Sequence, residues 1–430
     1  MSKPKKPSKQ SKPEHFQTVK GMSDIQPKDQ NYWKAIWQNG HSVSEIHDFY
    51  FIETPILESE DLFIRGVGEE TDVVQKQMYA FKTKGSDRVT MRPEGTAPVM
   101  RSYLEHHLGY FMTPLKVYYT GPMFRYERPQ AGRERQFHQW GFEIIGDADP
   151  VYDGQIILAT FGFLNSFKIK DLHLQINTIG CRVCRPTYRN RLKEYYKNHK
   201  SKLCVDCLRR YEKNPLRLLD CKEAVCLELK EKAPIILDCL CQACNNHFKG
   251  VLELIEDNGI PYDPKPYLVR GLDYYNRTVF EVVTPSFDSA IAAGGRYDYL
   301  SELIGGRPIP SVGAAIGLER LIEVMRIQEI QPKPKTKDKV FFTAMGDQAK
   351  KMSLRLINNL RSSGIATAEA LGKKSLRAQM KQADKVKATI ALIYGQKEAF
   401  EGTVIIRDMK TGAQETIVID KLVEEVKRRI

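Results

Sequence analysis

A loop rich in arginine, placed between two apolar segments, constrains the fold more than any other feature of the sequence. Residues 115–119 and 140–145 are apolar runs of strand length, and the stretch between them turns through Pro-Gln-Ala-Gly. This pattern predicts a strand, a long loop and a second strand. The loop collects guanidiniums, which grip phosphate as rigid paired donors and keep their charge: Arg125, Arg128, Arg133 and Arg135. A solvated hairpin tip with surface ion pairs is the alternative, and further arginines downstream favour phosphate binding.

Segments of strand and helix character alternate along the first three quarters of the chain. Apolar residues recur at helical spacing over 32–47, a hairpin is expected between 79–81 and 88–91, and another strand at 267–270. This order predicts an α+β fold with a mainly antiparallel sheet that carries helices. No glycine-rich phosphate loop stands where a doubly wound fold needs it, so side chains must hold phosphate. The pair Gly294-Gly295 predicts either close backbone approach to a ligand or a tight turn.

The composition is that of a globular protein without a membrane span. Hydrophobic residues make up 42% of the 430 positions, yet no apolar run approaches the ~20 residues that a spanning helix needs. The formal net charge is +13, of which five charges are lysines before Glu14. A basic balance suits a polyanion such as RNA, and solubility alone is the alternative. The basic N-terminus lacks the apolar core of a signal peptide, so we expect a cytoplasmic protein.

Composition also predicts the division of the chain into domains. Residues 1–13 are rich in Lys, Pro and Ser and are expected to form a disordered tail. A main domain should cover 14–325, with a cysteine-rich helical insertion at 171–259. A linker is expected at 326–338, and alternating strand and helix patterns predict a separate α/β domain at 339–430.

All nine cysteines lie in the expected insertion, mostly as closely spaced pairs. Two-residue spacing lets both thiolates bind one tetrahedral zinc ion, and a reducing compartment favours metal over disulfides. Two four-cysteine sites, one such site with spare thiols, and buried cysteines acting as small hydrophobic residues all remain open. Zinc here would be structural, in place of a core that the insertion is too small to build. The candidate ligands are Cys181, Cys184, Cys204, Cys207, Cys221, Cys226, Cys241 and Cys244, with Cys239 left over.

Three motifs resemble those of a known enzyme family. Phe-Arg-x-Glu at 124–127, followed by Arg133 and Phe137, resembles motif 2 of the class II aminoacyl-tRNA synthetases. Gly-Ala-Ala-Ile-Gly-Leu-Glu-Arg at 313–320 resembles their motif 3, and Arg-Gly-Leu-Asp-Tyr-Tyr at 270–275 resembles a signature of the histidyl-tRNA synthetase family. The resemblance runs from about Phe16 to the C-terminus. A weaker likeness to motif 1, around residues 49–56, implies a strand at a dimer interface.

The resemblance implies a fold, an activity and partners. The fold would be a class II antiparallel sheet flanked by helices, followed by an anticodon-binding α/β domain, in a homodimer. The activity would be that of a histidine–tRNA ligase. It would join L-histidine to ATP as histidyl-adenylate, release pyrophosphate, and pass histidine to the 3′ end of tRNA(His), with Mg²⁺ accompanying ATP. A catalytically inactive, histidine-binding regulatory subunit of the same fold is the alternative. The phosphate-binding arginines and the C-terminal domain favour the enzyme.

The resemblance also implies which arginines hold the phosphates. Phosphoryl transfer depends mostly on positioning and on charge stabilisation. Arg125 would lie between the substrate carboxylate and the α-phosphate, and Arg270 would approach the same phosphate from the other side. These two would be the catalytic residues and would also contact histidine. Arg133 and Arg320 would hold the outer phosphates.

The remaining implied residues recognise adenine and histidine. Phe137 would stack on adenine, and Glu127 would lie near its amine. Hydrogen-bond recognition of an imidazole can discriminate ~10⁴-fold without editing. The implied histidine site combines Glu94, Thr96 and Gln139 at the α-ammonium group with Glu143, Tyr274 and Tyr275 around the ring. Because neighbours on a strand face opposite ways, either tyrosine could be the one that meets the ring. His138 is expected to be a packed histidine.

Overall fold

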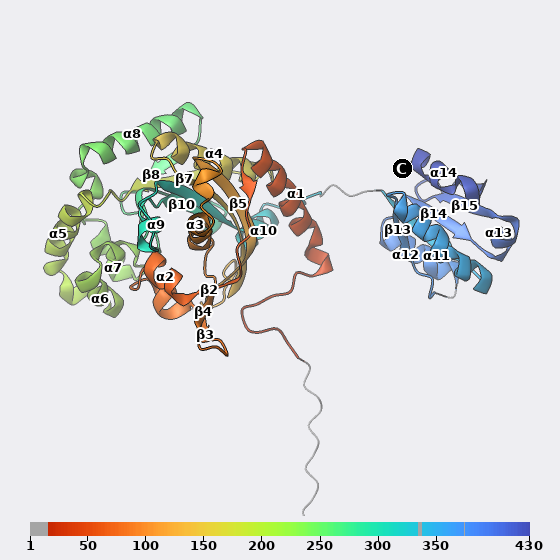
Figure 1. Cartoon of the computed structure of the whole chain (residues 1–430), viewed down its shortest axis with the longest axis horizontal. Helices are drawn as coiled ribbons and strands as arrows, with labels where there is room; N and C mark the ends of the chain where they lie inside the picture. The colour runs from red at the N-terminus through yellow and green to blue at the C-terminus, as the bar shows by residue number, and fades with distance from the viewer. Residues whose placement is uncertain (1–15, 334–337, 374) are drawn as a thin grey trace, which may run out of the picture. The chain divides into compact units, whose positions relative to one another are not determined.

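The computed structural model describes residues 16–333, 338–373 and 375–430, which fall into two compact units divided between residues 334 and 335 (Figure 1). The expected tail at 1–13 and residues 334–337 of the expected linker lie outside the described residues. No helix within the described ranges is long and apolar enough to cross a membrane.

The first unit is built on an eight-stranded sheet with the order β1-β5-β6-β11-β10-β9-β7-β8. All neighbours pair antiparallel except the edge pairs β1–β5 and β7–β8. The predicted α+β class with a mainly antiparallel sheet is therefore confirmed. The strands are β1 Tyr50–Phe51, β5 Leu115–Phe124, β6 Gln136–Ile145, β7 His173–Thr178, β8 Tyr262–Pro264, β9 Asn276–Thr284, β10 Phe287–Arg296 and β11 Ser311–Gly317.

Two hydrophobic cores cover the two faces of this sheet, because successive residues of a strand point to opposite sides. On β5, Tyr118 packs in one core while Val117 and Tyr119 pack in the other. The first core is closed by α1 Gln30–Ile46, α4 Pro150–Asn165, α8 Gln242–Asp257 and α10 Leu318–Ile327. The second is closed by α2 Glu60–Val67, α3 Thr96–Glu105 and α9 Leu300–Leu303.

A smaller sheet with the order β2-β4-β3 contains the predicted hairpin. Its strands are β2 Leu57–Ser59, β3 Tyr79–Lys82 and β4 Arg88–Met91, and β3 pairs antiparallel with β4. The segment that follows β4 leads through Pro93 to the start of α3, where Glu94 and Thr96 of the cleft described below are located.

The cysteine-rich insertion begins later than its composition predicts. Residues 173–178 form β7, which pairs with β9 inside the main sheet, so the boundary expected at residue 171 is wrong. The helices that project from the sheet are α5 Cys184–Lys197, α6 Val205–Lys213 and α7 Ala224–Lys230, and they share a core of their own (Figure 1). Helix α8, expected within the insertion, instead returns to pack on α4.

Two further expectations differ from the structure. Residues 267–270 form no strand, because the amide of Asn177 donates to the carbonyls of Pro266 (3.1 Å) and Leu268 (2.9 Å) in place of a neighbouring strand. Gly294 does not form the tight turn that was one of its two expected roles. It lies within β10, where an added Cβ would sit 2.3 Å from the carbonyl oxygen of Gly313 on β11.

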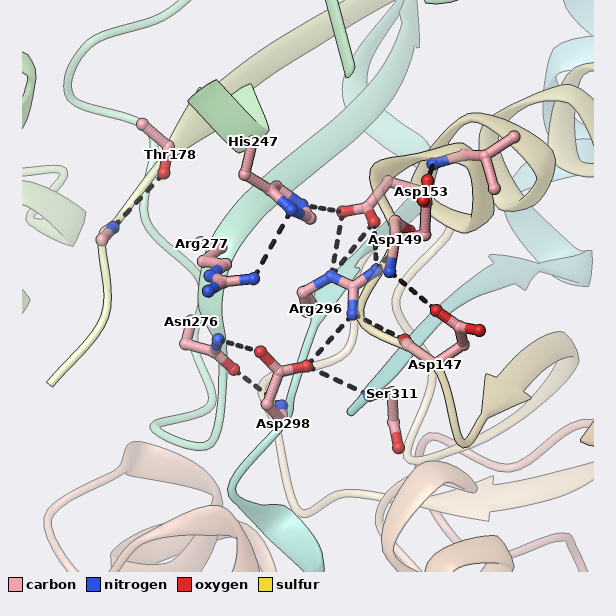
Figure 2. Close-up of polar contacts among 12 residues, drawn as sticks. Asp147, Asp149, Asp153, Thr178, His247, Asn276, Arg277, Arg296, Asp298 and Ser311 are labelled. Carbon is pink, nitrogen blue, oxygen red and sulfur yellow. Dashed lines mark hydrogen bonds and ion pairs between the residues drawn. The ribbon is translucent and has the colours of Figure 1, made fainter. Parts of the chain in front are cut away.

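A buried ion pair fastens α4 and α8 to the sheet. Figure 2 shows the guanidinium of Arg296, on β10, between the carboxylates of Asp153 on α4 and Asp298. His247, on α8, contacts Asp153 through Nε2 (3.3 Å) and receives a hydrogen bond from Arg277 of β9 at Nδ1 (3.5 Å). Although burial opposes ionisation, the charge of Arg296 lowers the pKa of Asp153 to about 2. Asp153 is therefore ionised at neutral pH and joins four elements at one point.

The second unit is a five-stranded mixed sheet with helices, as the alternating pattern predicts. Its order is β13-β12-β14-β15-β16, with β13, β12 and β14 parallel and the last two strands antiparallel. The elements are β12 Lys339–Ala344, α11 Asp347–Ser362, β13 Ala366–Glu369, α12 Leu376–Lys385, β14 Ile390–Tyr394, α13 Gln396–Glu401, β15 Thr403–Asp408, β16 Gln414–Val418 and α14 Leu422–Arg429.

Candidate active site

A cleft with a volume of about 140 Å³ opens over β6, β10 and β11 of the main sheet. Eleven of the twelve residues to which the resemblance gives a role in the site line it; Glu143 does not, and neither do Arg128 and Arg135 of the arginine-rich loop. The eleven are Glu94, Thr96, Arg125, Glu127, Arg133, Phe137, Gln139, Arg270, Tyr274, Tyr275 and Arg320. Residues more than 200 positions apart in sequence thus converge on one cavity.

One wall of the cleft is the hairpin formed by β5, β6 and the loop between them. The strands extend to Phe124 and Gln136, which pair, so the loop is shorter than expected. Arg125 Nε donates to the carbonyl of Pro93 (2.8 Å), and its guanidinium lies over the ring of Phe137 (5.4 Å to the centroid). A fixed cation therefore lies next to an aromatic face at the edge of the cleft.

The tip of this hairpin is tied to the sheet by Arg320, at the start of α10. Its Nε donates to the carbonyl of Gly132 (3.1 Å), and its Nη1 donates to that of Ala290 on β10 (2.7 Å). Glu127 and Arg133 form an ion pair across the loop (3.0 Å). Burial, and then the charges of Arg133 and Arg125, lower the pKa of Arg320. This crowding of positive charge would be relieved by a bound anion.

The opposite end of the cleft is held by the N-terminus of α3. The carboxylate of Glu94 accepts hydrogen bonds from the backbone N–H groups of Thr96 (2.7 Å) and Ala97 (2.9 Å), and from the hydroxyl of Tyr274 (3.3 Å). These donors fix the carboxylate where the helix dipole favours negative charge. Burial nevertheless raises the pKa of Glu94, so a cation next to it would be favoured.

Glu143 lies beneath the cleft rather than in its lining. It is four residues beyond Gln139 on the same face of β6, fully buried, and it accepts hydrogen bonds from the hydroxyls of Thr96 (2.7 Å) and Tyr297. Gly313 makes room for it, since an added Cβ there would sit 1.6 Å from Glu143 Oε2. Burial raises the pKa of Glu143 to about 8, so this carboxyl group is protonated at neutral pH.

Gln139 presents an unused acceptor to the cleft. Its Oε1 is buried and has no hydrogen-bond partner within the described part of the chain. An unpaired buried acceptor costs about 1–3 kcal/mol, which a donor on a ligand would offset. The side chain therefore supports a site that binds a polar ligand.

The second wall is the segment Arg270–Tyr275, which contains neither helix nor strand. Arg270 pairs with Glu281 on β9. The rings of Tyr274 and Tyr275 lie 4.6 Å apart at 48°, and both line the cleft. The expectation that a strand would turn the two tyrosines to opposite sides is therefore wrong.

Two tyrosines of the site were not singled out from the sequence: Tyr119, which lines the cleft, and Tyr297, which lies behind it on Glu143. Tyr119 lies across Gly95 and Gly141, at which an added Cβ would sit 2.2 and 2.1 Å from its ring atoms. Tyr297 donates to Glu143 and packs edge-on to Tyr274 (5.7 Å). Paired glycines in separate elements were the signal for Tyr119, but only the fold brings them together.

His138 is packed and hydrogen-bonded, as expected. Its Nδ1 lies 2.8 Å from Glu319 Oε1, and its backbone N–H donates to the same carboxylate (2.8 Å to Oε2). The ring of Trp33 meets it edge-on at 4.9 Å. These partners fix the orientation of the imidazole.

The cysteines gather in two groups of four. We call Cys181, Cys184, Cys241 and Cys244 the neck cluster, and Cys204, Cys207, Cys221 and Cys226 the inner cluster. In each cluster all four sulfurs lie within 4.8 Å of one another. All nine cysteines have free thiols, and Cys239 belongs to neither cluster. Four thiols so arranged suit one tetrahedral zinc ion each.

Known proteins resemble this chain over nearly its full length. The sequence pattern of the histidyl-tRNA synthetase family matches residues 21–184 and 218–321, and that of an anticodon-binding domain matches residues 339–429. A histidine–tRNA ligase of Dehalococcoides mccartyi is 44% identical over 96% of this chain and 100% of its own length.

Solved structures agree with these matches. An apo histidyl-tRNA synthetase of Staphylococcus aureus is 35% identical and superposes with a TM-score of 0.81, covering 96% of this chain and 100% of its own. A protein of Bacillus halodurans described as an ATP phosphoribosyltransferase regulatory subunit/histidyl-tRNA synthetase is 20% identical, with a TM-score of 0.63 over 89% of this chain and 99% of its own. At that identity the likeness shows the fold alone.

Proposed function

The chain belongs to the histidyl-tRNA synthetase family, and on that premise we propose how the residues of its cleft share the work of charging tRNA. The enzyme is an ATP-dependent aminoacyl-tRNA ligase. It activates L-histidine as histidyl-adenylate with release of pyrophosphate, then transfers histidine to the 3′ end of tRNA(His). The observation that carries the residue assignments is the convergence of eleven sequence-selected side chains on one cleft.

In the first step, an oxygen of the histidine carboxylate attacks the α-phosphorus of ATP, and the bond to pyrophosphate breaks. Arg125 and Arg270 are proposed to stabilise the charge that develops on the α-phosphate. The contact of Arg125 with the Pro93 carbonyl supports this role, because it fixes the guanidinium before substrate arrives. Arg270 retains an Nε without a partner among the described residues, which leaves a buried donor for the phosphate.

The hairpin wall is proposed to hold the rest of ATP. Arg133 and Arg320 would bind the outer phosphates, and the depressed pKa of Arg320 supports a site that favours anions. Phe137 would stack on adenine and Glu127 would accept from its amine. ATP enters with Mg²⁺, which neutralises phosphate charge. The carboxylates of Glu134 and Glu319 also line the cleft and would offer the oxygen ligands that Mg²⁺ prefers.

The other half of the cleft is proposed to recognise histidine. Glu94 would pair with the α-ammonium group, and Thr96 and Gln139 would complete that end. Tyr274 and Tyr275 would border the imidazole, with Arg125 and Arg270 near the carboxylate. Glu143 would not contact histidine directly. It would act from beneath the cleft by accepting hydrogen bonds from the hydroxyls of Thr96 and Tyr297 and so holding these side chains in place. Hydrogen-bond recognition of this kind needs no separate editing site.

Amino-acid-dependent exchange of labelled pyrophosphate into ATP tests the proposal, with each amino acid tried in turn. Exchange with histidine alone is expected. Exchange with another amino acid would mean that the pocket residues are wrongly assigned, whereas histidine binding without exchange would favour the regulatory-subunit alternative. That alternative has little support, because a synthetase-like protein that had lost catalysis would not need every phosphate-binding arginine in the cleft.

We propose that each cysteine cluster binds one structural Zn²⁺. Zinc–sulfur bonds of ~2.3 Å put the sulfurs of a tetrahedral site roughly 3.8 Å apart. The distances between Cys181 and Cys184 (3.7 Å), Cys181 and Cys241 (3.8 Å), and Cys204 and Cys221 (3.8 Å) agree with that edge. Elemental analysis should find two zinc ions per chain.

We also propose a homodimer formed through the β1 edge of the main sheet. Strand β1 at this edge exposes Tyr50 and Phe51, and the exposed Phe111 packs edge-on against Tyr50 (5.7 Å between centroids), so a monomer would leave these apolar side chains in water. Phe51→Asp should shift the sedimentation coefficient to that of a monomer, while Phe400→Asp, at an exposed position of the second unit, should leave it unchanged. We also propose that the protein is cytoplasmic.

A further inference from the structure

We propose that the cysteine-rich insertion positions the cleft segment Arg270–Tyr275 through two arginines, Arg185 and Arg217, each held by one cysteine cluster. The inference rests on the proposed zinc sites and on the proposed roles of Arg270, Tyr274 and Tyr275. Neither arginine touches the cleft space that the substrates would fill. Both are positioning residues, which act on catalysis through the backbone of the segment.

The segment depends on outside support, because it has no helical or strand hydrogen bonds of its own. Its first carbonyl, that of Arg270, accepts from Arg217 Nη1 at 3.0 Å. Its last, that of Tyr275, accepts from Arg185 Nη2. Between them, the amide of Asn214 lies 3.4 Å from each carboxylate oxygen of Asp273. All three donors belong to the insertion, so the insertion supports both ends and the middle of the segment.

The neck cluster fixes the position of Arg185. Arg185 directly follows Cys184 at the start of α5, and its Nε also donates to the carbonyl of Ile179 (3.3 Å). Gly180, at φ +63°, leaves no room for a Cβ, which would sit 2.7 Å from Cys184 Cβ. Cys241 donates its backbone N–H to Cys184 Sγ at 3.2 Å. A metal ion bound by these thiols would hold the base of α5, and with it Arg185, at one place.

The inner cluster fixes the position of Arg217. Arg217 lies in the short helix Pro215–Asp220, which ends directly before Cys221. Its side chain is 4% exposed, and Asp220 lies 3.6 Å from Nη1. The backbone N–H of Cys221 closes this turn on the carbonyl of Leu218 (3.3 Å). A metal ion at Cys221 would therefore fix the turn that aims Arg217 at the segment.

The two arginines should affect different steps, because they hold opposite ends of the segment. Arg185 supports the carbonyl of Tyr275, at the histidine end, so its loss should raise the KM for histidine. Arg217 supports the carbonyl of Arg270, the proposed α-phosphate ligand, so its loss should lower kcat. Small misplacements of reacting groups have large rate effects, and about tenfold is expected in each case.

The test uses the full-length protein with its metal content measured. Arg185→Met and Arg217→Met remove the donors while keeping side-chain length. Arg185→Met should raise the KM for histidine about tenfold and leave the KM for ATP within about threefold. Arg217→Met should lower the kcat of pyrophosphate exchange about tenfold, with the KM for histidine nearly unchanged. Lysine at either position keeps one donor and should restore part of the loss.

Arg191→Met is the matched control, since Arg191 is an exposed residue of α5 whose guanidinium donates to the carbonyl of Asp238 (3.5 Å), away from the segment. It should match wild type in both parameters. Arg185→Met and Arg217→Met variants that behave like this control, with zinc retained, would overturn the inference and leave the zinc sites standing. If the wild-type protein holds no zinc but the two methionine variants still show these changes in KM and kcat, the positioning role would be supported and the metal sites overturned.

Cysteine variants test the link between metal and segment. Cys184→Ser and Cys207→Ser should each leave one zinc ion per chain. Cys184→Ser should raise the KM for histidine as Arg185→Met does, and combining the two should add little, because both act through one connection. Full additivity in the double variant would contradict a shared route. Near-ultraviolet circular dichroism checks that each variant has folded. If a variant has not folded, Arg185→Lys and Arg217→Lys are measured in its place.

Discussion

The two walls of the cleft carry similar chemistry but are held in different ways. The hairpin wall is an extension of the main sheet, and the register of β5 and β6 places Arg125 and Phe137 on either side of its loop. The segment wall, Arg270–Tyr275, has no such register, and side chains from the insertion hold its carbonyls. A wall made of paired strands is specified by local pattern, whereas a wall held by distant side chains is specified only by the whole fold.

This difference has an energetic side. The backbone hydrogen bonds between paired strands are distributed over many residues, so one substitution removes only a small part of the stabilisation. Charge-assisted hydrogen bonds from single arginines are stronger, but each depends on one side chain. We therefore expect the segment wall to be more sensitive to single substitutions than the body of the hairpin wall.

The largest expected effect is at Glu143, which lies on β6 of the hairpin wall and accepts hydrogen bonds from Thr96 and Tyr297. Burial raises the pKa of Glu143 to about 8 in the folded protein, which keeps the proton up to that pH, while the unfolded chain releases it near the ordinary glutamate pKa of 4.5. The contribution of this group to stability is therefore fully present below pH 4.5 and lost as pH rises to 8. The loss is up to ~5 kcal/mol in the free energy of unfolding.

Glu143→Gln should remove that loss. Denaturant unfolding at pH 5 and pH 8 measures it, and wild type should lose more stability across this interval than the variant. Glu253→Gln, at an exposed position of α8, controls for the change in net charge. An equal pH dependence in wild type and Glu143→Gln would mean that the buried carboxyl group is ionised in the folded protein.

Arg270→Ala tests the segment wall directly. We expect pyrophosphate exchange to fall about 10³-fold, roughly 4 kcal/mol, because the developing charge on the α-phosphate loses a fixed cation. Histidine affinity, measured by calorimetric titration, should change less than about threefold. A parallel loss of binding and exchange would refute this division of roles between Arg270 and the histidine-binding residues.

Gly313→Ala tests how closely the hairpin wall packs on its neighbouring strand. The added Cβ would displace the carboxyl group of Glu143 and meet the carbonyl of Phe142 at 2.7 Å. Overpacking of this kind costs about 3 kcal/mol, seen as a lower midpoint of denaturation. Gly372→Ala has open space around its Cβ and should have little effect. Equal midpoints for both variants would show that the strand yields easily.

Arg320→Lys has the smallest expected effect and probes a point where the hairpin wall also depends on a single side chain. Lysine cannot reach the carbonyls of Gly132 and Ala290 together, so the hairpin tip should loosen. We expect the KM for ATP to rise about 30-fold, near 2 kcal/mol, with the KM for histidine unchanged. If the KM for histidine rose instead, the proposed division of the cleft between its walls would be wrong.

The parts of the structure that were predictable from sequence are those specified locally. The alternating and turn patterns predicted β3, β4 and the α/β character of the second unit, and the arginine loop between 124 and 136 led to the cleft. Residues 267–270 have the composition of a strand, but the Asn177 amide takes two of the carbonyls that this region would offer to a neighbour. Nothing in the segment itself indicates this.

The site residues follow the same rule. The resemblance to the synthetase motifs was enough to select the eleven lining residues. Glu143 can be buried only because Gly313, in another strand, has no Cβ. The position of Tyr119 likewise depends on the absence of a Cβ at Gly95 and Gly141. Arg185 and Arg217 were not found, because their partners are backbone carbonyls 90 and 53 positions away, which no side-chain pattern marks.

The neck cluster has a consequence for how a protein of this architecture can change over generations. Cys184 and Cys241 are in contact, so the chain leaves the main unit and returns to it at one point, as a side branch. A side branch can be lengthened, trimmed or exchanged without shifting any strand of the sheet. The stretch that the family pattern leaves unmatched, 185–217, begins and ends on the two supporting arginines. A replacement module would preserve the active site if it presented donors to the same two carbonyls, whatever its length or sequence in between.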